Sequence, residues 1–77
     1  MASTVVRAEI LLQIETCDLL LAQSEGHILR QQSRVDAMTE GSSDRKLSEE
    51  ILATLKSLLW TYLDRRDYLL SKLREAG

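Results

Sequence analysis

The sequence predicts an all-α fold, an antiparallel two-helix hairpin of the coiled-coil kind. Three observations carry this prediction. The chain has no proline, and Leu, Glu, Arg, Gln and Ala, which are good helix formers, are common. A single stretch, residues 39–44, is typical of a break. On both sides of it, apolar residues recur at alternating spacings of three and four, the pattern of a helix that packs against another helix.

The first helix is predicted over residues 4–38, the loop over 39–44 and the second helix over 44–75. Gly41 can adopt the left-handed conformation that ends a helix. The residues that can cap the second helix are Ser42, Ser43 and Asp44, with Ser48 as a second candidate ahead of Glu49 and Glu50. Acidic residues early and basic residues late in each helix suit the helix dipole, although scattered solvated charges would give a similar pattern.

Residues 1–77 are predicted to form a single small domain whose own core is marginal, because a chain this short buries only about 60% of its unfolded surface. Cys17 is the only cysteine, so an internal disulfide is impossible. His27 is the only histidine, which leaves a Cys/His zinc site without enough ligands. The remaining way to complete the core is association, so the hairpin is predicted to be part of a larger helical bundle formed with other chains.

Two stripes run along the first helix. The Ile-rich stripe comprises Ile10, Ile14, Cys17, Leu21, Ser24, Ile28, Gln31, Val35 and Met38. The small-residue stripe comprises Ala8, Leu12, Glu15, Leu19, Ala22, Gly26, Leu29, Ser33 and Ala37. A helix with one neighbour needs one apolar stripe, so two stripes predict two neighbours.

The second helix supplies one neighbour through a stripe made of Leu52, Leu55, Leu59, Tyr62, Arg66, Leu69 and Leu73. A charge within such a stripe is costly unless it is paired. A turn near residue 42 places Arg66 opposite Glu15 to Leu19, so we expect an intrachain contact to Glu15 first and to Asp18 second. This pairing assigns the small-residue stripe to the intrachain contact. The alternative is that the Arg66 side chain extends to water and its position carries no information.

The Ile-rich stripe is then left for another chain. The predicted partner-binding residues are Ile10, Ile14, Cys17, Leu21, Ile28, Val35 and Trp60. Trp60 lies opposite the apolar stripe of the second helix and should be exposed on an isolated hairpin. Exposed aromatic side chains are enriched at interface hot spots, although a lone surface aromatic is also common. Cys17 is interpreted as a small core residue and His27 as a solvated helix residue.

Catalysis has little support in this sequence, and we predict that the protein is not an enzyme. Cys17 and His27 lie almost three turns apart on one helix and cannot form a catalytic pair. There is no glycine-rich phosphate loop, no CxxC and no HExxH. No cofactor, metal or small-molecule substrate is therefore expected. A net charge of −2 argues against nucleic-acid binding, and no apolar stretch is long enough to span a membrane.

The sequence predicts an intracellular, cytoplasmic protein-protein interaction module, a helical-hairpin subunit that completes its core by packing with copies of itself or with another helical subunit. The alternative is a small helical chaperone that shields an amphipathic helix of a client protein and then releases it. In length, single break and apolar stripes the chain resembles hairpins that dimerise into four-helix bundles. It also resembles the hairpin co-chaperones of bacterial type III secretion needles. The resemblance is one of shape, and no motif transfers a residue role.

Overall fold

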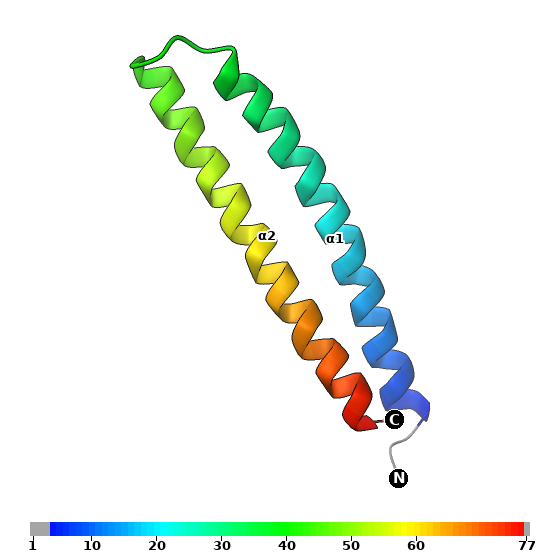
Figure 1. The fold of residues 1–77 in the computed structure, drawn as a ribbon. Coiled ribbons are helices and arrows are strands. Elements are labelled where there is room, and N and C mark those ends of the chain that lie inside the picture. The colour runs from blue at the N-terminus through cyan, green and yellow to red at the C-terminus, as the bar shows by residue number, and fades with distance from the viewer. Residues whose placement is uncertain (1–3, 77) are drawn as a thin grey trace.

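The computed structural model describes residues 4–76, which form two long helices joined by a short loop at residues 37–42 (Figure 1). Helix α1 spans Thr4–Asp36 and helix α2 spans Ser43–Ala76. The two helices run antiparallel and side by side, so the start of α1 and the end of α2 lie at the same end of the molecule (Figure 1). Residues 4–76 contain no β-strand. The prediction of an all-α, two-helix hairpin is confirmed.

The hairpin is long and thin, with principal extents of 59 × 14 × 12 Å. Each helix therefore has one neighbour within the chain, and a large part of its circumference faces outward. Among the described residues, no side chain is less than 2% exposed. The structure thus has a buried seam between two helices and lacks the enclosed core of a larger domain.

The loop is fixed by local chemistry that the sequence indicated. Gly41 has a φ of 77°, the left-handed conformation that a glycine adopts without a steric penalty. The Ser42 hydroxyl accepts a hydrogen bond from the Arg45 backbone N–H at 3.1 Å and donates one to the Thr39 carbonyl at 2.8 Å. Ser42 is thus the N-terminal cap of α2, which begins one residue earlier than predicted.

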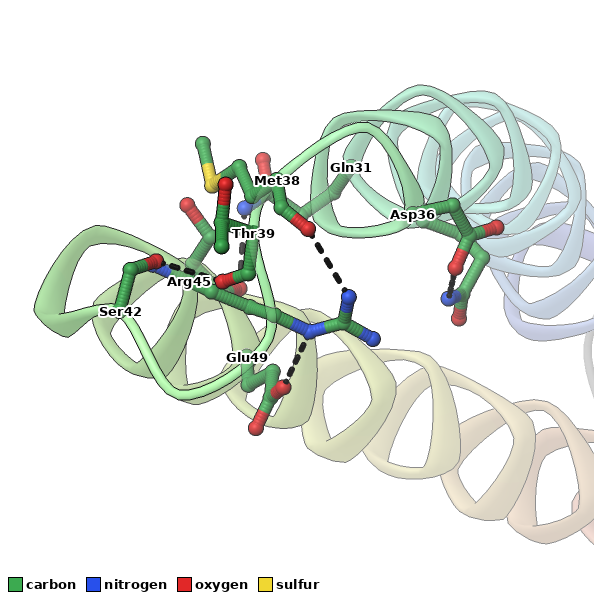
Figure 2. Close-up of polar contacts among 9 residues, drawn as sticks. Gln31, Asp36, Met38, Thr39, Ser42, Arg45 and Glu49 are labelled. Carbon is green, nitrogen blue, oxygen red and sulfur yellow. Dashed lines mark hydrogen bonds and ion pairs between the residues drawn. The ribbon is translucent and has the colours of Figure 1, made fainter.

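Arg45 ties the loop to α2 (Figure 2). Its Nη1 donates to the Met38 carbonyl at 3.0 Å, and its Nε donates to Glu49 Oε1 at 3.0 Å. The Met38 backbone N–H donates to the Val35 carbonyl, a contact three residues back that tightens the last turn. This tightening explains why α1 ends at Asp36, two residues before the predicted end.

The seam is built from heptad positions on both helices. Every member of the Ile-rich stripe, from Ile10 on α1 to Met38 just beyond its end, is buried or half-buried. On α2, the alternation of threes and fours continues through buried or half-buried positions at Arg45, Ser48, Leu52, Leu55, Leu59, Tyr62, Arg66, Leu69, Leu73 and Ala76. Sustained alternation of this kind is the signature of coiled-coil packing.

Burial within the seam is greatest toward its two ends. Near the termini, Ile14, Cys17 and Leu69 form a cluster. The half-buried side chains packed against this cluster are Ile10, Leu70 and Leu73. Toward the loop, the buried side chains are Gln31, Val35, Ser48 and Leu52. The middle of the seam, where Ser24 and Ile28 lie on α1, is only half-buried.

The predicted assignment of the two α1 stripes to their neighbours is corrected by this packing. The Ile-rich stripe, including the predicted partner-binding residues Ile10, Ile14, Cys17, Leu21, Ile28 and Val35, is the one that lies in the intrachain seam. The small-residue stripe faces outward, and Leu12, Leu19 and Leu29 are 63%, 66% and 70% exposed. The physical reason is the amount of apolar area, because burial free energy scales with that area and the small-residue stripe contains Glu15, Gly26 and Ser33.

Candidate interaction surface

Arg66 pairs across the hairpin with Asp18, with Nε 2.6 Å from Oδ1. The sequence predicted Glu15 as the first partner and Asp18 as the second, so the first choice is wrong and the second is found. With the Ile-rich stripe inside, Glu15 turns outward, whereas Asp18 borders the seam. The side chains of Arg66 and Asp18 are 38% and 51% exposed, which makes this a surface ion pair.

A buried polar contact lies toward the loop end of the seam. The Gln31 side chain is on α1, and its Nε2 donates a hydrogen bond to the Ser48 carbonyl of α2 at 3.0 Å. Gln31 and Ser48 are 6% and 8% exposed. Because an unpaired buried amide is costly, this bond favours the one register that brings the two residues together. Ser48, an alternative helix start in the sequence, instead lies inside α2.

The outward face of α1 carries exposed apolar side chains. It consists of the small-residue stripe. Val5, three residues before Ala8, continues this stripe toward the N-terminus and is also exposed. The stripe lies on the opposite side of α1 from the seam, because its members are offset from the seam positions by about half a helical turn. Large side chains alternate along it with alanine, glycine and serine, so the surface has both protrusions and flat places.

A second exposed apolar surface lies on one flank of the hairpin, where the middle of the seam opens. A shallow groove of about 200 Å³ is lined there by Leu20, Gln23, Ser24, His27, Leu55, Leu58 and Tyr62. Ile51 and Leu58 on α2 are 46% and 44% exposed. Ile51 directly precedes Leu52 in the sequence, and Leu58 directly precedes Leu59. Their positions beside the seam residues were the signal that they border the contact and are not fully covered by it.

Trp60 and Tyr68 project from α2 away from the seam, and they are 66% and 59% exposed. The predicted exposure of Trp60 is confirmed, and its contact with a partner stays a prediction. Lys72 Nζ lies 5.5 Å from the centre of the Tyr68 ring and 3.3 Å from Glu75 Oε2. The hydrogen bond to Glu75, together with the negative charge of that carboxylate, raises the pKa of Lys72 above its ordinary value of 10.5.

The chemistry-bearing side chains stay apart in the structure. Cys17 is a free thiol that is 3% exposed within the seam, whereas His27 is exposed. Residues 4–76 contain no group of three or more His, Cys, Asp or Glu side chains that could hold a metal ion. Neither helix, over the residues described, combines the length and apolar character needed to cross a membrane.

Comparisons with known proteins add no relative to this picture. No protein-family model, curated protein or solved structure matches the chain. The candidate site is therefore defined by its own geometry, as two exposed apolar surfaces on a thin hairpin.

Proposed function

We propose that this protein is a non-enzymatic interaction module, a helical-hairpin subunit that covers its exposed apolar surfaces by packing against helices of another chain or of further copies of itself. The observation that carries the proposal is the outward row of Leu12, Leu19 and Leu29, each more than 60% exposed. Several large apolar side chains exposed along one helix face are a candidate site of association.

The thinness of the hairpin supports the same proposal. With extents of 14 × 12 Å across the helix pair, the chain cannot fold back to cover the outward face of α1. Exposed large apolar side chains occur along both helices: Val5, Val6, Leu11, Leu12, Leu19, Leu29, Leu47, Ile51, Leu58, Trp60 and Tyr68. Association would bury this surface without a change in the hairpin itself.

The first test is sedimentation equilibrium of the purified chain at micromolar concentration. The second is to use the chain to capture binding proteins from the native organism, to purify each captured protein and to reconstitute its complex with the chain. The matched control is a variant in which Leu12, Leu19 and Leu29 are replaced by Gln. These side chains are exposed, so the variant should keep its helical circular dichroism while it loses association. A cooperatively folded monomer that reconstitutes with no captured protein would contradict the proposal.

A further inference from the structure

We propose that the small-residue stripe of α1 binds a second copy of this chain, with the two α1 helices antiparallel and the two-fold axis passing beside Leu19. This inference rests on the proposed function and names the partner of the outward face. It predicts a flat four-helix assembly in which the two α1 helices lie at the centre and the two α2 helices lie outside.

Charge complementarity is the first argument for a second copy. The acidic residues of α1 are Glu9, Glu15, Asp18, Glu25 and Asp36, and its basic residues are Arg7, Arg30 and Arg34. Glu9 and Arg30 both border the stripe on the same side, each one position after a stripe residue. An antiparallel pairing about Leu19 brings Glu9 of each copy opposite Arg30 of the other. A parallel pairing would instead place the residues of this edge on opposite sides of the contact, so Glu9 would not meet Arg30.

Size complementarity is the second argument. In the same antiparallel register, Leu12 of one copy falls opposite Gly26 of the other, and Ala8 falls opposite Leu29. Each large side chain then faces a small one, except for Leu19, which meets its own copy at the axis. Close packing of large against small side chains is what allows two helix surfaces to interdigitate.

The space beside Gly26 is suited to this contact. A methyl group built at Gly26 would meet only the guanidinium of Arg30, at 3.4 Å from Nη1. Within the described chain, therefore, the Arg30 side chain alone lies over Gly26 on its outward side. Arg30 is long and exposed, so it can turn aside toward Glu9 of the second copy as Leu12 takes its place.

The length of the surface is sufficient for a specific contact. Within α1, the stripe with its extension runs from Val5 to Ser33, about 42 Å along the helix at the usual rise of about 1.5 Å per residue. In a two-fold arrangement the same patch serves both partners, so each exposed leucine is buried twice in the assembly.

A charge-reversal experiment tests both the partner and the orientation. Glu9→Arg and Arg30→Glu are each expected to weaken dimerisation about tenfold in sedimentation equilibrium at low salt, because two ion pairs become two repulsions. The double variant carries both reversals on every copy and restores the pairs, so its dimerisation constant should return to within about threefold of the original. Two weakened single variants without recovery in the double variant would overturn the antiparallel arrangement.

A matched pair of leucine variants locates the contact. Leu19→Arg places two like charges at the axis and should weaken dimerisation about a hundredfold or more. Leu47→Arg makes the same change at a leucine of α2 that is 58% exposed and should leave dimerisation unchanged. Both variants should keep the circular dichroism of the hairpin. Equal effects of the two variants would overturn the assignment of the contact to α1.

Failure of this inference is distinguishable from failure of the proposed function. If the unmodified chain is still a monomer at a concentration 100 times higher than the micromolar range, a second copy is not the partner and the inference is overturned. The proposed function would then depend on a different chain, which the reconstitution experiment detects. If the chain dimerises and Glu9→Arg, Arg30→Glu and Leu19→Arg all leave dimerisation intact, self-association stands and the α1 contact is overturned.

Discussion

Truncation of two neighbouring apolar side chains on α1 would test which face of this helix packs within the chain. Ile14 is 8% exposed and contacts the cluster with Cys17 and Leu69, whereas Leu12 is 63% exposed on the small-residue stripe. The residues are two positions apart, so their positions along the hairpin are nearly matched. Ile14→Ala and Leu12→Ala should therefore differ mainly in what each side chain touches.

The magnitudes follow from burial. Replacing a buried isoleucine with alanine costs about 2–5 kcal/mol, and a hairpin only 12–14 Å thick lets neighbours and water close part of the gap. We therefore expect Ile14→Ala to cost about 2–3 kcal/mol, a large part of the roughly 4–12 kcal/mol typical of a chain of this length. Leu12 has about a third of its surface covered, so Leu12→Ala should cost about 0.5 kcal/mol.

The assay is urea unfolding followed by far-ultraviolet circular dichroism, with protein at dilutions where the chain is monomeric and again at high concentration. The loss of unfolding free energy in Ile14→Ala should be the same at both concentrations. In thermal unfolding, the melting temperature of this variant should fall by about 10–20 °C. The cost of Leu12→Ala should grow with concentration, because that side chain is covered only on association. Equal losses for the two variants at high dilution would refute the packing of the Ile-rich stripe against α2.

Three further predictions concern polar contacts and the loop. A double-mutant cycle of Asp18→Ala and Arg66→Ala should give a coupling of about 0.2–1 kcal/mol that falls with added salt, because both side chains are partly exposed; a coupling of several kcal/mol would show a buried pair. Gln31→Leu should change the free energy of unfolding by less than about 1.5 kcal/mol, since the lost hydrogen bond is offset by apolar burial, whereas Gln31→Ala should be clearly destabilising in the same urea assay. Gly41→Ala should cost about 1–2 kcal/mol from its φ of 77°, and Ser42→Ala about 1 kcal/mol from loss of the cap, with unchanged stability in either variant counting against the loop geometry.

The sequence was sufficient for the features that local chemistry determines. The left-handed Gly41 and the capping Ser42 act on their immediate neighbours, so their roles could be predicted without knowing the rest of the fold. The burial of Cys17 and the exposure of Trp60 followed from helical periodicity alone, since each lies plainly on or off an apolar stripe. The ends of the helices shifted by one or two residues because hydrogen bonds of the loop, such as that of Arg45 to Met38, are tertiary details.

The sequence alone does not determine which of the two α1 stripes packs against α2. Periodicity indicates that a stripe is buried, but it does not indicate whether α2 or another chain buries it. A pairing of Arg66 with Glu15 would favour the small-residue stripe as the intrachain face. A long, partly exposed arginine at the border of a seam can reach carboxylates on either side, however, and Arg66 reaches Asp18. A flexible charged side chain is thus a weak indicator of which face is buried. A buried polar residue with a shorter side chain than arginine would distinguish the two stripes better.

Gln31 is that residue, because its amide must be satisfied within the seam if its stripe is buried. In the structure Gln31 lies close to Ser48, a small residue that leaves room for the amide to reach the α2 backbone, and the bond is 3.0 Å long. A polar residue of one helix facing a small residue of the other could have ranked the Ile-rich stripe first. With the Ile-rich stripe inside the hairpin, the surface of α1 that is available to a partner consists of the outward leucines and not of the isoleucines. On the outward face, the exposure of Leu12, Leu19 and Leu29 then has no intrachain explanation, which is why it carries the proposal of a second chain.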